Sequence, residues 1–237
     1  MTEKYYAGGY WPGRREPVDA YARRAESFFR RLALIDDAFA QWFEQANSPD
    51  AARKRGVELE HRALTGLFAM EKYQQGAGDV AFAAWNGSVV GSSVANISCG
   101  SRSRHVLDRC TLTLPSTGPV AERLLSSVTL AQVVSAMALA WEPEWAIATS
   151  VSHRDMSSEF ADPGTFAGWL IYVARQRGAV PPLPAPVRLE QVEDKGTLII
   201  LTPERFTASN PEHVALAEVV HATLEQAGLM RPLQAQP

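Results

Sequence analysis

The sequence predicts an α+β protein, with a mostly antiparallel sheet flanked by helices and a helical region at the N-terminus. Apolar residues recur at spacings of three and four between residues 17 and 45, which is typical of an amphipathic helix. Short apolar or alternating runs cluster after residue 80 and are separated by turn signals. Helices and strands do not alternate regularly, which argues against a parallel βαβ series.

The composition indicates one soluble globular domain over residues 1–237. The chain is 46% hydrophobic and 21% charged, and a chain of 237 residues can bury a large core without disulfides or metals. We expect a helical part over about 17–74 and a sheet-containing part over about 80–228. A net charge of −3 argues against a dedicated nucleic-acid binder. We find no secretory signal and no apolar stretch of about 20 residues, so we expect a cytoplasmic protein with no membrane partner.

The N-terminal third is predicted to be helical. Pro17 suits a first helical turn, because its missing N–H has no partner there. A second helical region is expected over residues 50–74, with Ser48 as its N-cap and a break at Gly56.

The middle of the chain changes to strands. Residues 80–85 lead into Asn86-Gly87, a dipeptide typical of a tight hairpin with positive φ at both turn positions. The following strand extends to Cys99, and residues 110–114 alternate with period two, as a third strand would. Residues 119–141 return to a helical pattern.

The last third combines strands with one helix. Residues 145–151 and 168–174 are predicted strands, and residues 187–192 and 197–202 are predicted to form a hairpin with Gly196 in a left-handed conformation. Asn210, Pro211 and Gly228 are placed to cap, open and close a final helix. The triplet 153–155 is expected in a polar loop after a strand.

Residues that could carry out chemistry are few. The five histidines lack metal-ligand spacing, and neither a metal nor a cofactor is predicted. A nucleophilic site of Cys99, His105 and Asp108 is conceivable. Cys99 belongs to a predicted strand, however, and the other two belong to a predicted loop. We therefore expect Cys99 and Cys110 to be reduced, buried core thiols.

The charge distribution suggests a partner-binding surface. Residues 142–194 carry eight acidic and four basic side chains, a net charge of −4. Such a region can steer a basic partner. Two acidic groups are candidate partner contacts, one in a predicted loop and one at the hairpin: Asp155, Glu159 and Asp162, and Glu190, Glu193 and Asp194.

Several segments, in order along nearly the whole chain, resemble the immunity protein 52 family of polymorphic-toxin systems. They are YYAGGYWPGRRE, AWNG, AWEPEWAIATS, GWLIYVARQRGAVPPLPAP, GTLIILTPERF and NPEHVALAE. Trp145 or Trp169 and Gly196-Thr197 match the positions that characterise the family. The set of segments carries the resemblance, because none of them is a catalytic motif.

The resemblance implies an α+β immunity protein rather than an enzyme, with no active site or cofactor. Its partner would be a cognate nuclease toxin with a restriction-endonuclease-like domain, such as a type VI secretion effector. An acidic surface would suit the basic substrate groove of a nuclease. Two other classes stay open: an effector-binding chaperone or adaptor, and a small hydrolase that uses Cys99 or a serine.

Overall fold

The computed structural model describes residues 2–76, 78–102, 106–157 and 165–233. The described strands form one nine-stranded sheet in the order β2-β3-β4-β5-β1-β6-β7-β9-β8, and every neighbouring pair is antiparallel. The predicted α+β class with an antiparallel sheet is confirmed. The strands are β1 (Tyr5–Trp11), β2 (Phe43–Glu44), β3 (Val80–Trp85), β4 (Val94–Cys99), β5 (Asp108–Leu114), β6 (Trp145–Ser150), β7 (Leu170–Ala174), β8 (Arg188–Val192) and β9 (Gly196–Ile200).

Helices precede, interrupt and follow the strands. They are α1 (Val18–Ala33), α2 (Pro49–Arg53), α3 (His61–Phe68), α4 (Gly118–Leu124), α5 (Ser127–Trp141), α6 (Val151–Ser157) and α7 (Pro211–Gln226), with short 3₁₀ turns η1 (Asp37–Phe39), η2 (Glu71–Tyr73) and η3 (Arg175–Arg177).

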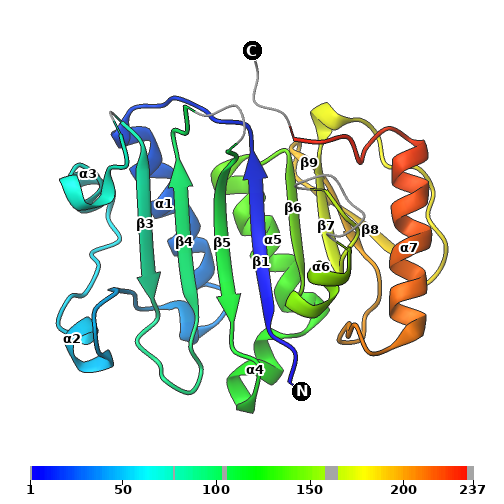
Figure 1. The fold of residues 1–237 in the computed structure, drawn as a ribbon, viewed down its shortest axis with the longest axis horizontal. Helices are drawn as coiled ribbons and strands as arrows, with labels where there is room; N and C mark the ends of the chain where they lie inside the picture. Colours follow the sequence, from blue (N-terminus) through cyan, green and yellow to red (C-terminus); the bar gives the residue numbers. More distant parts are fainter. Residues whose placement is uncertain (1, 77, 103–105, 158–164, 234–237) are drawn as a thin grey trace.

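Strand β1 lies in the middle of the sheet, between β5 and β6 (Figure 1). The sequence pattern predicts no strand here, and the two adjacent glycines, Gly8 and Gly9, lower the strand propensity of the segment. Glycine at position 8 leaves room for the Tyr10 side chain, because a β-carbon there would lie 2.6 Å from the Tyr10 hydroxyl oxygen. The Tyr10 side chain therefore occupies the space that a larger residue at position 8 would need.

The N-terminal helices are shorter than predicted. Helix α1 ends at Ala33, and the chain continues through η1 into β2. Its apolar face packs into the core as expected, with Tyr21, Phe28 and Leu32 almost fully buried. The region 50–74 contains two helices and a 3₁₀ turn, and the predicted N-cap is confirmed: the Ser48 hydroxyl accepts a hydrogen bond from Ala51 N at 3.2 Å.

The predicted helix 119–141 is divided at residues 125–126. The Ser126 hydroxyl accepts a hydrogen bond from Thr129 N at 3.1 Å and caps α5. Helix α5 is apolar around much of its surface because it packs against α1 and against β1, β6 and β7. No single helix in the described part is long and apolar enough to cross a membrane; α4 and α5 meet those limits only as a pair bent by 69°.

Both predicted hairpins exist, but their turns differ from prediction. β3 and β4 are joined by the eight residues 86–93, and Gly87 has a φ of 76° whereas Asn86 is not in the positive-φ region. In the β8–β9 hairpin, Glu193 adopts the left-handed conformation with a φ of 46°. Gly196 has no positive φ and belongs to β9, so that prediction is wrong. A β-carbon at Gly196 would lie 2.3 Å from the Val173 carbonyl oxygen, so glycine is needed there for close strand approach.

The triplet 153–155 belongs to helix α6 rather than to the predicted polar loop. His153 is buried, and its Nε2 lies 2.8 Å from the Ala167 carbonyl oxygen. The caps of α7 are confirmed. The Asn210 side chain accepts a hydrogen bond from Glu212 N at 3.0 Å, and Gly228 has a φ of 72° just past the helix.

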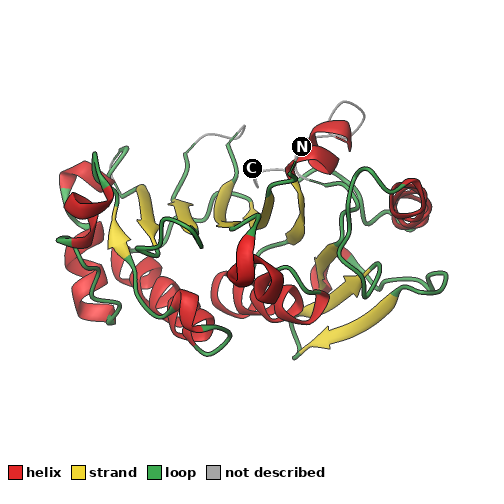
Figure 2. Cartoon of the chain, turned by 90° about the horizontal axis from the view of Figure 1, so that it is seen from below, coloured by secondary structure: helices red, strands yellow, loops and turns green. Residues whose placement is uncertain are grey.

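The two faces of the sheet are covered unequally. In Figure 2, α1 and α5 lie on one side, and among the described residues no helix lies over β3, β4 and β5 on the other side. The burial pattern agrees: β6 and β7 are buried at every position, whereas β3, β4 and β5 alternate between buried and more accessible residues. Strand β1 is buried at every position except Tyr10. We call the side of β1, β3, β4 and β5 that faces away from α1 and α5 the open face.

Candidate functional site

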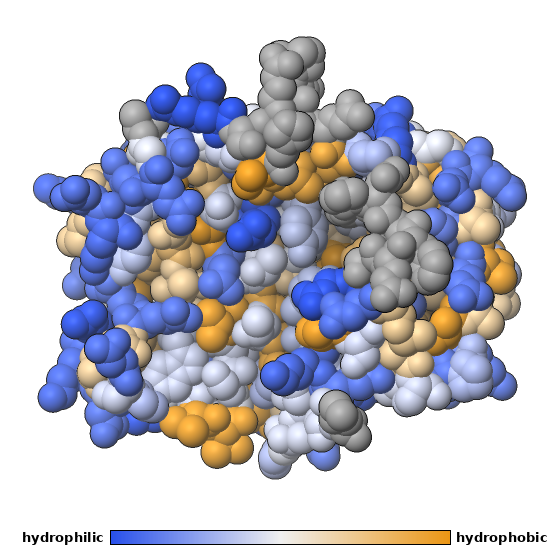
Figure 3. Space-filling model, in the orientation of Figure 1, coloured by the Kyte–Doolittle hydropathy of each residue, from blue (hydrophilic) through white to orange (hydrophobic). Residues whose placement is uncertain are grey.

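A groove of about 600 Å³ lies on the open face. Its floor comes from β1 and β5, and its sides come from the β3–β4 loop and from α6. Figure 3 shows this side of the molecule, with mainly polar and mixed side chains over the central strands. The groove residues used below are Lys4, Tyr6, Tyr10, Val90, Thr113 and Arg154.

Two tyrosines of β1 form part of the groove floor. Tyr6 and Tyr10 each lie two positions from Gly8, on opposite sides of it, so all three share one face of the strand. The Arg154 guanidinium lies over the Tyr6 ring, 5.6 Å from its centroid. Burial raises the pKa of both tyrosines, so at neutral pH their hydroxyls are uncharged hydrogen-bonding groups. This arrangement can bind a ligand surface but offers no activated nucleophile.

The β3–β4 loop is held in one conformation by the buried side chain of Asn86. Its Nδ2 donates to the carbonyl oxygens of Ala38 at 3.1 Å and Gly91 at 2.9 Å. Its Oδ1 accepts from Ser93 N at 3.0 Å. With the further hydrogen bond from Ser88 N to Oδ1 at 3.4 Å, four hydrogen bonds of one amide brace the loop.

Trp85 adds a second brace at the start of the loop. Its indole N–H lies 3.0 Å from the Ser92 hydroxyl and 3.2 Å from the Ser88 carbonyl oxygen. The loop tip nevertheless points into solvent, with Val89 64% and Val90 79% exposed. The loop therefore combines an ordered base with an exposed apolar tip.

The acidic residues of the predicted hairpin lie where the sequence places them. Glu190 is exposed on the edge strand β8, with a carboxylate oxygen 3.7 Å from Arg188. Glu193 and Asp194 are exposed at the β8–β9 turn. The structure therefore brings these three carboxylates onto one element.

Asp155 lies apart from that hairpin. It is exposed on α6, and Arg154 donates to its Oδ1 at 2.6 Å. Helix α6 follows the end of β6 at Ser150. The hairpin turn lies near the other end of β6. Arg175 N donates to Lys195 O in this turn at 2.8 Å, and Arg175 follows β7, whose Val173 pairs with Trp145 at the start of β6. The six residues of β6 represent roughly 17 Å of strand. Glu159 and Asp162 lie outside the described residues.

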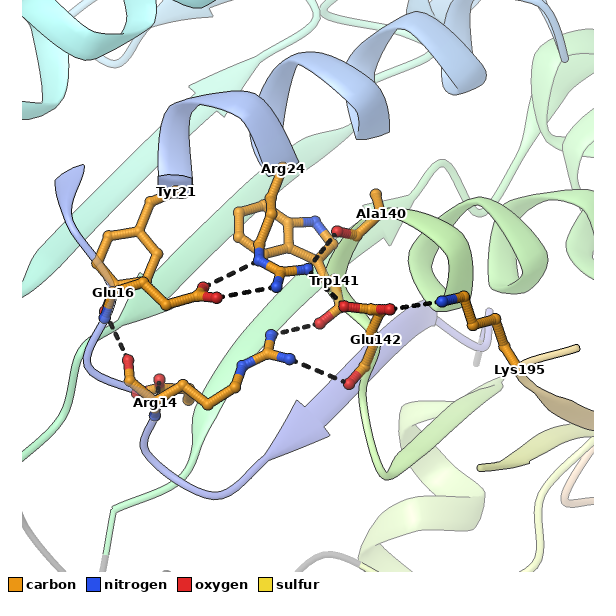
Figure 4. A network of polar contacts seen from close by, with 9 residues as sticks. Arg14, Glu16, Tyr21, Arg24, Ala140, Trp141, Glu142 and Lys195 are labelled. Carbon is orange, nitrogen blue, oxygen red and sulfur yellow. Dashed lines mark hydrogen bonds and ion pairs between the residues drawn. The ribbon is translucent and has the colours of Figure 1, made fainter. Parts of the chain in front are cut away.

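A polar network connects the hairpin turn to the helical layer (Figure 4). The Glu142 carboxylate lies 2.7 Å from Lys195 Nζ and 3.1 Å from Arg24 Nη1. Arg24 also makes two 2.9 Å contacts with the Glu16 carboxylate. A local sequence pattern does not connect these residues, because Glu142 lies 118 positions from Arg24 and 53 positions from Lys195.

Glu142 is the C-cap of α5 and has a left-handed φ of 48°. Arg24 donates to the Ala140 carbonyl oxygen at 3.1 Å, and Arg14 donates to that of Trp141, so cations satisfy the carbonyls at this helix end. Lys195, and then Arg24, lower the pKa of Glu142 despite its partial burial. We interpret the network as a structural brace, because its charges neutralise one another.

Cys99 and Cys110 are the buried core thiols that the sequence predicts, and Cys99 is poorly suited to the nucleophilic site that was conceivable there. Cys99 and Cys110 are buried, and burial raises the pKa of both thiols well above the usual value. The nearby Asp108 raises the pKa of Cys99 further. Asp108 is itself buried and accepts hydrogen bonds from three backbone N–H groups, those of Arg14, Gly100 and Ser101, at 3.0, 3.0 and 2.9 Å.

Asp108 therefore holds together the backbone of the β4–β5 loop and the backbone at Arg14, in the segment that follows β1. A thiol that resists ionisation is a poor nucleophile. His105 lies outside the described residues. Within the part of the chain that the structure describes, no group of three or more histidine, cysteine or acidic residues could hold a metal ion.

Residues 3–233 match the family described as immunity protein 52. The chain belongs to the immunity protein 52 family. The segments that resemble this family in the sequence thus identify it correctly, and an immunity-type role follows from the membership. A search of curated proteins found no match.

A solved structure gives independent support for the fold of this immunity protein. The Pseudomonas aeruginosa T6SS protein PA0821 superposes with a TM-score of 0.56 at 14% sequence identity. The match covers 99% of this chain and 76% of that chain. At this identity the likeness concerns the fold alone.

Two patterns in the sequence are related to the groove. Tyr6 and Tyr10 share a strand face, and Arg109, Thr111 and Thr113 alternate outward along β5. These patterns could have indicated one polar face on adjacent strands. They could not indicate that β1 and β5 are neighbours, which depends on pairing across about 100 residues of chain.

Proposed function

We propose that this protein binds a cognate nuclease toxin by direct contact and keeps it inactive in the cytoplasm of the producing cell. Membership of the immunity protein 52 family over residues 3–233 carries the proposal. The resemblance implies a toxin with a restriction-endonuclease-like domain. The likeness in fold to a T6SS protein supports a type VI secretion setting.

The chemistry of the described residues supports inhibition by direct binding to the toxin rather than by a chemical reaction that this protein catalyses. Cys99 is buried with a raised pKa, and the carboxylates at the centre of the molecule are used in structural contacts. An inhibitor needs a preformed, complementary surface, since ordering a surface on binding lowers affinity.

The acidic hairpin is one proposed contact. Glu190, Glu193 and Asp194 would approach a basic substrate groove of the toxin and steer its association. The sequence also makes Asp155, Glu159 and Asp162 candidate toxin contacts. Asp155 lies at the opposite end of β6, so we propose the hairpin group as the one that acts together.

The test is co-expression with the adjacent toxin gene in a cell that lacks other immunity genes. We expect growth to be restored and the purified pair to bind with nanomolar or tighter affinity, about −12 kcal/mol. Killing at equal expression would contradict the proposal. Tight binding to a different effector domain without protection would indicate a chaperone or adaptor, whereas protection without binding would indicate an enzyme.

A further inference from the structure

We propose that the groove on the open face, with the Val89-Val90 loop tip beside it, is the main docking surface for the toxin. We also propose that the toxin segment it accepts carries carboxylates next to an apolar side chain. This inference rests on the proposed function and specifies its contact surface.

The β3–β4 loop presents an apolar tip beside the groove. Val90, which is 79% exposed, lines the groove, and the adjacent Val89 is 64% exposed. Single exposed apolar residues are common, but here the pair is held out by the buried amide of Asn86 and by the Trp85 indole. A loop that is already ordered loses little conformational entropy on binding, so its apolar contacts contribute more fully to affinity.

The groove itself is lined by tyrosine and arginine side chains. Tyrosine and arginine are enriched among the residues that dominate binding energy at protein interfaces. Tyr6 is packed beneath the Arg154 guanidinium, and the Tyr10 ring occupies the space above Gly8. These side chains are therefore in place before a partner arrives.

Positively charged side chains lie in and beside the groove. Lys4 lies in the groove and Arg109 lies on the same face, opposite Tyr10 in the β1–β5 register. Both are exposed, and within the described residues neither forms an ion pair. The nearby Asp155 is already bonded to Arg154. Among the described charged side chains named here (Lys4, Arg109, Arg154 and Asp155) the surplus is positive, so they complement an acidic partner, in contrast to the acidic hairpin.

The test uses the purified full-length protein and the purified toxin made inactive by substitution. Val90→Glu places a charge in the apolar contact, and Lys4→Glu and Arg109→Glu reverse the positive charges. We expect Val90→Glu to weaken the Kd by about tenfold or more. The two charge reversals should slow association most strongly at low salt. Val219→Glu is the matched control, because Val219 is 51% exposed on α7, away from the groove lining.

The outcomes separate the two proposals. No binding by the wild-type protein would refute the proposed function itself. Wild-type binding that all three groove variants retain, with unchanged Tm, would overturn the groove as the docking surface. In that case a loss of affinity in Glu190→Lys/Asp194→Lys would place the toxin at the acidic hairpin. Weakened binding by the groove variants, with Val219→Glu unaffected and a smaller loss of affinity in the hairpin variant, would support the groove as the main docking surface.

Discussion

Gly196 on β9 approaches Val173 on β7 so closely that a β-carbon at position 196 would lie 2.3 Å from the Val173 carbonyl oxygen. The Cα of Ala174 would be 2.9 Å from the same β-carbon. Both obstacles are backbone atoms of a buried central strand, so neither can move without distorting the sheet. The glycine is required by strand spacing rather than by its φ angle.

We therefore expect Gly196→Val to lower the free energy of unfolding by about 1–3 kcal/mol or more, as overpacking a core does. Denaturant unfolding of the purified protein measures the change. Gly66→Ala is the control, because a β-carbon there meets nothing within 4 Å and the residue is helical. That control should stabilise the protein by about 0.4–1 kcal/mol. Equal stability of Gly196→Val and wild type would contradict the close approach.

Asn86→Ala should loosen the β3–β4 loop. The substitution leaves Ser93 N and the carbonyl oxygens of Ala38 and Gly91 without their side-chain partner. A buried polar group left unpaired costs about 1–3 kcal/mol, so a lower Tm is expected. Amide hydrogen exchange should also become faster at residues 86–93. If exchange in the loop is unchanged, the amide does not brace it. Ser88→Ala, at a half-buried neighbouring position, is the milder comparison.

The Glu142 carboxylate should make stability depend on pH. Lys195 and Arg24 lower its folded-state pKa, so its contribution is present above the usual carboxyl pKa of about 4.3 and is lost as pH falls through the folded value. Glu142→Gln should therefore lower the Tm at neutral pH, and the difference from wild type should shrink in acid. Glu58→Gln is the control, since Glu58 is exposed. A Tm difference that is the same at all pH values would argue against the ion pairs.

Cys99 and Cys110 should be dispensable for protection. Their burial and raised pKa predict slow reaction with thiol reagents in the folded protein and fast reaction after unfolding. Replacing each by alanine should cost about 1 kcal/mol of stability and leave toxin neutralisation intact. Thiol titration and a co-expression growth assay check the two parts. Loss of protection by a folded Cys99→Ala variant would restore the hydrolase hypothesis.

Charge reversal tests the acidic hairpin. If Glu190 and Asp194 steer the toxin, Glu190→Lys/Asp194→Lys should slow association and weaken its salt dependence, with little change in Tm because both residues are exposed. Asp155→Lys provides the comparison at the far end of β6. Stopped-flow association rates at low and high salt measure the effect. Identical rates for the hairpin variant and wild type would exclude steering by this group.

Local signals in the sequence were sufficient where structure depends on nearby residues. Asn210 and Gly228 flank α7, Ser48 caps α2, and the alternation along β5 gave the strand and its buried side. Caps and strand alternation act within a few residues, so they can be interpreted without knowing the fold. The family resemblance likewise needed only the order of segments, and it indicated the immunity-type role.

Tertiary contacts decided the features that carry the candidate site. Strand β1 has a weak local signal, yet it lies between β5 and β6 because pairing on both edges satisfies its backbone groups. The same placement sets Tyr6 and Tyr10 beside Thr113 and Arg109 and creates the groove floor. Gly196 is required by Val173, which lies 23 positions earlier, and Glu142 is balanced by Arg24 and Lys195 from distant segments. Such contacts depend on how the chain folds back on itself, and a local sequence pattern does not contain that information.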